Sequence, residues 1–192
     1  RAIDDADKLI EGGVDGIIIE NFGDAPFAKG QVEPQVVAQM SIIAYEIKKR
    51  VTCPIGINVL RNDAYSAMGI AATIMADFIR VNVHSGAMLT DQGIIEGQAH
   101  DTLRYKKLLG ANVGIIADVL VKHAVPIGDQ ILVPTAKDIY YRGLADALIL
   151  SGTGTGEPAD INDCKIMRRS EERRVGKEWS ARGATQQKKT ET

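Results

Sequence analysis

Apolar residues recur along the chain with two alternating spacings, one helical and one typical of buried strands. Helical spacing predicts helices over residues 1–13, 34–50, 62–76, 98–109 and 134–142. Short β-branched runs between them predict strands over residues 16–21, 54–60, 78–83, 113–121 and 147–150. Asp160 is placed to cap one further helix. Strands that alternate with helices in this way are typical of a parallel sheet in an α/β fold.

An internal repeat narrows the fold class. The turns before three of the predicted strands each contain an aspartate that separates a helix end from an apolar run: Asp15, Asp77 and Asp146. These aspartates lie about two βα units apart, as expected of a barrel built from repeated units. We therefore predict a TIM-type (β/α)8 barrel with parallel strands, and a doubly wound sheet is the alternative.

Polar residues share one face of the predicted strands. In the third strand Ile79 and Val81 alternate with Arg80, and successive strand residues face opposite ways. The β-branched set suits packing under helices, and the polar set then faces the barrel interior near its C-terminal mouth. The same alternation elsewhere places seven polar residues at this mouth: Glu20, Asn58, Arg80, Asn82, His84, Asp118 and Lys122. Because burial of unpaired polar groups is costly, these groups must pair with one another, face water or meet a ligand. The alternative to a ligand site is a structural ion pair of Glu20 with Arg80, with Asn58 and Asn82 as interior hydrogen-bonding residues.

Three of the seven have side chains suited to catalysis. His84 can act as an acid or a base near neutral pH, and Asp118 can act as a partner base or orient a neighbour. Lys122 can bind an anion, or act as a nucleophilic amine if it is desolvated. Glu20, His84, Asp118 and His123 also have the ligand types of a divalent-cation site, but no spacing motif supports one. We predict catalysis by His84, Asp118 and Lys122, assign no metal and identify no cofactor.

Two loops are expected at the same mouth. The glycine-rich segment 151–156 lacks both Walker and Rossmann spacing, and it is either an anion-binding loop or a flexible turn. Its candidate binding residues are Ser151, Gly152 and Gly154. The long loop 85–97 can reach over the site as a lid. Its polar candidates, which can equally be solvated, are Asp91, Gln92 and Glu96.

Composition excludes some function classes. The chain is 45% hydrophobic and 25% charged with a net charge of −2, so nothing indicates a nucleic-acid partner. No apolar run approaches the roughly 18–20 residues that a membrane helix needs, and peripheral membrane association stays open. We expect a cytoplasmic protein that binds a small molecule and forms a homo-oligomer.

The last part of the chain differs from the rest. Apolar periodicity ends near Arg169, and residues 169–178 resemble a translated sequencing adapter. We predict a barrel domain over residues 1–168 and a non-native tail over 169–192. A basic interaction tail is the alternative.

Several long motifs resemble the BtpA (SgcQ-like) family across residues 1–168. They cover residues 16–27, 56–63, 80–86, 90–97 and 117–124. The resemblance implies a TIM-type barrel related to phosphate-binding barrels, with one strand upstream of Arg1 and two beyond the predicted domain. Asn21 and Arg61 lie within these motifs and join the candidate substrate-binding residues, together with His123.

The resemblance leaves two classes of function open. The first is a cytosolic enzyme, a lyase, isomerase or hydrolase, that acts on a small polar or phosphorylated metabolite. The second is a non-catalytic biogenesis factor for photosystem I or other membrane complexes, because the family name comes from a proposed role in photosystem I accumulation. An assembly factor should tolerate Asp118→Asn, whereas an enzyme should not.

Overall fold

A parallel sheet of five strands forms the centre of the molecule in a computed structural model that describes residues 1–129, 131–152, 154 and 156–168. The strands are β1 Ile17–Glu20, β2 Ile55–Asn58, β3 Phe78–Val81, β6 Gly114–Asp118 and β8 Ala147–Ile149. The labelled helices are α1 Ala2–Glu11, α2 Pro34–Lys48, α3 Ala64–Ile74, α4 Ala99–Leu108 and α5 Leu132–Lys137, and the further helix expected after Asp160 is present over residues 161–168. A 3₁₀ turn, η1, covers Phe22–Asp24, and α5 continues as a π-helical turn, η2, over Asp138–Arg142. The predicted α/β class is confirmed.

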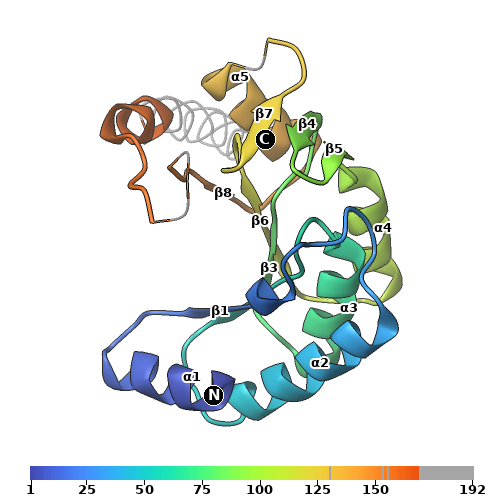
Figure 1. The fold of residues 1–192 in the computed structure, drawn as a ribbon, viewed down its shortest axis with the longest axis vertical. Coiled ribbons are helices and arrows are strands. Elements are labelled where there is room, and N and C mark those ends of the chain that lie inside the picture. The colour runs from blue at the N-terminus through green and yellow to red at the C-terminus, as the bar shows by residue number, and fades with distance from the viewer. Residues whose placement is uncertain (130, 153, 155, 169–192) are drawn as a thin grey trace, which may run out of the picture.

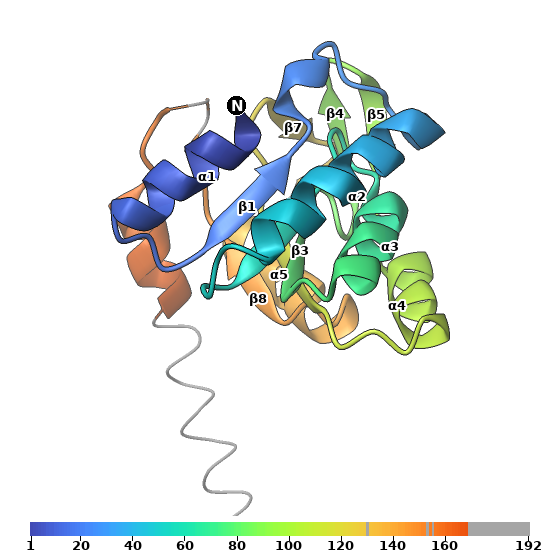
Figure 2. The same ribbon diagram turned by 90° about the horizontal axis from the view of Figure 1, so that it is seen from below.

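The order of the strands is consistent with part of a TIM-type barrel. Neighbours in the sheet follow chain order, β1-β2-β3-β6-β8, without the reversal that defines a doubly wound sheet. Figure 1 shows α1, α2, α3 and α4 following one another around the outside of the curved sheet, and Figure 2 shows them covering the same side. The doubly wound alternative is therefore wrong for the described residues.

The β-branched face of the sheet packs under the helices as predicted. Ile57, Ile79 and Ile115 lie side by side in register and are fully buried. They share one core with α2 and α3, where Ala44 and Met68 are also fully buried. This row fixes the parity of the strands, so the polar residues between these positions face the opposite side.

Two of the three repeated aspartates, Asp77 and Asp146, connect neighbouring strands of the sheet. The Oδ2 atom of Asp77, just before β3, accepts a hydrogen bond from the backbone N–H of Ile55 in β2 at 2.8 Å. Asp146, just before β8, does the same for Ile115 in β6 at 2.7 Å. Each aspartate therefore ties the start of its strand to the start of the neighbouring strand. The bond from Ile55, followed by the bond from Lys48, holds the pKa of Asp77 below its usual range.

The prediction of a loop over residues 85–97 is wrong. This segment forms a hairpin of β4 Ala87–Thr90 and β5 Gly93–Glu96, and β4 also pairs with β7 Ala124–Pro126. Gly93 has a φ of +96°, which permits the tight turn. Met88 and Ile95 pack with Val83 and Val121 in a second small core. Pairing with β7 adds a third strand to the β4–β5 hairpin, and a two-stranded hairpin alone would be only marginally stable.

Candidate functional site

Five of the seven predicted mouth residues form one hydrogen-bonded network, which we call the mouth network: Glu20, Asn58, Arg80, Asn82 and Asp118. They come from the ends of β1, β2, β3 and β6. The register aligns Glu20 with Asn58, and the Oε1 atom of Glu20 accepts hydrogen bonds from Asn58 Nδ2 at 2.9 Å and Arg80 NH1 at 3.1 Å. Strand order and parity together therefore bring these side chains into contact.

Asp118 occupies the centre of the network. Its carboxylate accepts from Arg80 Nε at 3.1 Å and Arg80 NH2 at 3.0 Å, and Asn82 Nδ2 donates to it at 2.8 Å. Both of its oxygens are therefore engaged, and Asp118 is only 2% exposed. Of the two roles that the sequence leaves open for Asp118, this geometry suits the residue that orients its neighbours better than the partner base. Burial opposes the charge of Arg80, but Asp118 and Glu20 outweigh it and raise the pKa of Arg80.

Two acceptor atoms of the network are left for other partners. Among the described residues, no hydrogen bond reaches the Oε2 atom of Glu20, whose side chain is 25% exposed. The Oδ1 atom of Asn82 is buried, and in the described part of the chain it has no hydrogen-bond partner. The bond from Asn82 Nδ2 to the Asp118 carboxylate fixes the orientation of this amide. One partly exposed carboxylate oxygen and one buried amide oxygen thus remain as acceptors.

Arg61 follows β2 and lies beside the mouth network. Its NH2 group donates to the backbone oxygen of Lys122 at 2.8 Å, which links the ends of β2 and β6. Asn21 holds Leu60, the residue before Arg61. The Oδ1 atom of Asn21 accepts from Leu60 N at 2.7 Å, and its Nδ2 atom donates to Leu60 O at 3.3 Å. Asn21, expected to bind substrate, therefore positions this turn.

Lys122 shares a smaller pocket with other predicted residues. A cavity of about 300 Å³ at the ends of β6 and β8 is lined by Lys122, His123, Ser151 and Gly152. The Oγ atom of Ser151 is buried without a partner among the described residues. Gly154 does not line this cavity, and residues 153 and 155 lie outside the described part of the chain. The structure thus brings Ser151 and Gly152 of the glycine-rich segment close to Lys122.

His84 does not join the mouth network, contrary to the sequence-based expectation. Its ring is 1% exposed, and Nε2 donates to the carbonyl of Gly143 at 2.8 Å. It lines a separate cavity of about 760 Å³ between residues of α4 and α5. Strand β3 ends at Val81, so the alternation of facing directions does not extend to residue 84. Burial lowers the pKa of His84 despite the bond to Gly143.

The buried imidazole of His84 predicts a pH dependence of stability. Because its folded-state pKa lies below the unfolded value near 6.5, the unfolded chain binds a proton first as the pH falls. The free energy of unfolding should decline below about pH 6.5 by up to roughly 1.4 kcal/mol per pH unit from this group. Urea titrations of the wild type and of His84→Gln between pH 5 and 8 test this, and equal slopes in both would contradict it.

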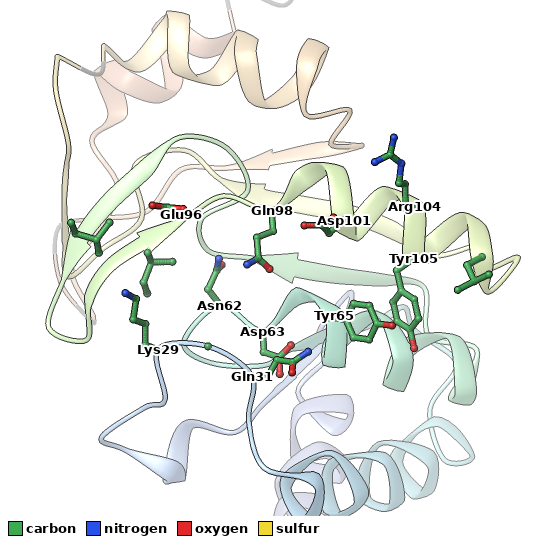
Figure 3. Close-up of a pocket in the computed structure, with 14 residues that line it drawn as sticks. Lys29, Gln31, Asn62, Asp63, Tyr65, Glu96, Gln98, Asp101, Arg104 and Tyr105 are labelled. Carbon is green, nitrogen blue, oxygen red and sulfur yellow. The ribbon is translucent and has the colours of Figure 1, made fainter.

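A cavity larger than the two described above lies apart from the mouth network. It measures about 1010 Å³ and lies between α3, α4 and the β4–β5 hairpin (Figure 3). Tyr65 and Tyr105 stack at its wall with ring centroids 3.6 Å apart. Glu96, expected over the mouth, lines this cavity instead, and no residue of the mouth network does. Size alone therefore does not mark the chemically organised site.

The remaining polar residues have structural or peripheral places. The side chain of Asn62 bonds both the N–H and the carbonyl of Val83, at 2.8 and 2.9 Å. Asp63 caps the N-terminus of α3, where its Oδ1 atom accepts a hydrogen bond from Ser66 N at 2.9 Å. Asp91 and Gln92 lie at the hairpin turn and bond each other at 2.6 Å. An asparagine in the short turn between a strand and the next helix is the signal that could have marked Asn62.

The alternative metal site is not assembled among the described residues. Glu20 and Asp118 both bind Arg80 at the mouth, but His84 lies in another cavity. In this part of the chain, no three histidine, cysteine or acidic side chains gather as a metal-binding group. The helices of the described ranges also include none long and apolar enough to cross a membrane.

Comparisons with known proteins place these features in context. A family model described as the BtpA family matches residues 1–177. A protein named Photosystem I biogenesis protein BtpA, from Synechocystis sp., is 54% identical over 166 residues, which cover 86% of this chain and 58% of that protein. An uncharacterized protein from Methanocaldococcus jannaschii is 50% identical over 165 residues, 86% of this chain and 62% of that protein.

The similarity extends to eukaryotes. An uncharacterized mitochondrial protein from Caenorhabditis elegans is 31% identical over 167 residues, 83% of this chain and 60% of that protein. The chain thus spans about three fifths of the length of these relatives.

Proposed function

The chain belongs to the BtpA family, and we propose that it contributes the catalytic mouth of a cytoplasmic barrel enzyme that acts on a small polar or phosphorylated metabolite. The observation that carries this proposal is the mouth network with its unused acceptors on Glu20 and Asn82. A network needed only for stability would be expected to satisfy its buried amide oxygen within the protein. Its place at the C-terminal ends of the strands is where barrel active sites lie.

In this proposal Glu20 transfers the proton. Its Oε1 is fixed by Asn58 and Arg80, which leaves Oε2 at the open side of the network. A carboxylate held in this way can act as a general base toward a bound ligand or water and then, once protonated, as a general acid, a role open to lyase, isomerase and hydrolase chemistry. Asp118 positions Arg80 and Asn82, and Lys122 supplies a cation at the neighbouring pocket. His84 has no part in this proton transfer, because it lines a separate cavity.

A second candidate function rests on a different observation. The Synechocystis relative is named a photosystem I biogenesis protein. A chain that assists assembly would use its outer surface and would not need Glu20 or Asp118 for chemistry. Full activity of Asp118→Asn in an assembly assay would favour this candidate.

A thermal-shift screen of small polar and phosphorylated metabolites tests the enzyme proposal. A ligand present at 100 times its dissociation constant should stabilise the chain by about 2.7 kcal/mol. Glu20→Gln preserves an oxygen for Asn58 and Arg80, so it should fold normally yet lower the rate of the reaction by about 10²–10⁴-fold.

The matched control is Glu46→Gln, on the outer side of α2, where the carboxylate pairs with Lys49. It should leave ligand shift and rate unchanged. Absence of any stabilising metabolite, or a rate in Glu20→Gln equal to that of the wild type, would count against the proposal.

A further inference from the structure

Arg61 is a buried cation with few partners. The residue is 5% exposed, and a guanidinium carries five N–H donors. Among the described residues its side chain makes one hydrogen bond, from NH2 to the Lys122 carbonyl, and its Nε is buried without a partner. None of the ion pairs formed by the described residues includes it. Most of its donors are therefore available to something else.

Arg80 provides the comparison within the same mouth. Its guanidinium makes three hydrogen bonds to the carboxylates of Glu20 and Asp118. Arg61 lies close enough to feel the charges of Asp91 and Asp118, but burial outweighs them and lowers its pKa. An unpaired buried charge is strongly unfavourable, so the chain carries a cost at Arg61 that an anion would remove.

The surrounding residues hold Arg61 in place. Asn21 bonds both the N–H and the carbonyl of Leu60, and Asn62 bonds both backbone groups of Val83. The turn that carries Arg61 is thus fixed on both sides by asparagine side chains. Such support from neighbouring side chains is what a preorganised binding group requires.

We infer that Arg61 binds the anionic group of the ligand, a carboxylate or a phosphate, through its guanidinium fork. The inference rests on the proposed function, because it names the class of molecule that the mouth receives. Planar donors of arginine match both anions in a bidentate geometry. Asn82 Oδ1, which is buried without a partner among the described residues, then accepts from a hydroxyl of the same ligand. The ligand class is a small hydroxylated anion.

The pocket beside Lys122 is the less suitable place for that anion. Its lining includes Asp160 and Asp163 together with Lys122, so carboxylates are already present there. At Arg61 the chain offers a guanidinium fork to which no carboxylate of the described residues is bound. The anion is therefore assigned to Arg61.

The experiment is a thermal-unfolding titration of the 192-residue chain with inorganic phosphate and with acetate, each compared with chloride at equal ionic strength. One of the two anions should raise the unfolding midpoint of the wild type in a saturable way, and the stronger one identifies the source. Arg61→Met should weaken the binding of that anion about tenfold or more, since charge-assisted bonds are lost. Arg61→Lys retains the charge without the fork and should bind with intermediate affinity.

The control is Arg50→Met, at an exposed arginine that pairs with Asp7, and it should keep the anion response of the wild type. No saturable effect of either anion, or a response in Arg61→Met equal to that of the wild type, overturns the inference. A neutral metabolite that binds in a Glu20-dependent way with unchanged affinity in Arg61→Met would overturn it while leaving the proposed function intact.

Discussion

Asp118→Leu should lower the free energy of unfolding by about 3–5 kcal/mol, because it removes the carboxylate that pairs with a buried guanidinium. Asp118 is almost fully buried and accepts two bonds from Arg80 and one from Asn82. The substitution leaves Arg80 with Glu20 as its remaining acceptor. Urea unfolding followed by circular dichroism measures the loss.

Two variants show whether the loss comes from the broken pair. The double variant Arg80→Met with Asp118→Leu should recover much of the stability, since apolar side chains can replace a buried ion pair. Asp101→Leu, at an exposed carboxylate on α4, should change stability little. A single Asp118→Leu variant as stable as the wild type would mean that the mouth network contributes nothing to folding.

Gly97→Ala should destabilise the chain by roughly 1–3 kcal/mol or more through steric overlap with backbone. A Cβ at this position would lie 2.5 Å from the carbonyl oxygen of His84 and from the N and Cα atoms of Ser85. Because these are backbone atoms, no side-chain rotation can relieve the overlap. The variant would push β5 away from the turn that follows β3, where Gly97 N donates to the Gly86 carbonyl.

Gly23→Ala is the matched control, since a Cβ there would meet nothing within 4 Å. Equal urea midpoints for Gly97→Ala and Gly23→Ala would contradict the close packing of the hairpin. A loss confined to Gly97→Ala would confirm that the hairpin is held rigidly over the ends of β3 and β6.

The mouth network shows that sequence periodicity predicts the direction of a side chain only within a strand. Inside a strand, side chains alternate strictly, so the inward direction of Asn58, Arg80 and Asp118 followed from their neighbours. Past the end of the strand the rule no longer applies. His84 lies three residues after β3 ends, and its partner is the carbonyl of Gly143, far away in the chain.

The hairpin illustrates a second limit. Residues 87–96 contain both apolar and polar positions, and they read as a loop when judged alone. Their strand structure depends on pairing with β7, which comes about thirty residues later. Pairing at such a distance is a property of the folded molecule, and local pattern does not encode it.

The sequence by itself determined the alternation of helices and strands, the parallel sheet and the inward face of each strand. Those features follow from local periodicity and from the burial of one apolar face. Only the tertiary structure decided which polar groups meet. It joined Glu20, Arg80 and Asp118 into one network, placed His84 in another cavity and left the buried Arg61 side chain with a single hydrogen bond to the described part of the chain. The physical reason is that side chains at the strand ends can bond only when the register between strands and the geometry of the turns bring them together. Register and turn geometry are fixed only when the strands pair in the folded protein.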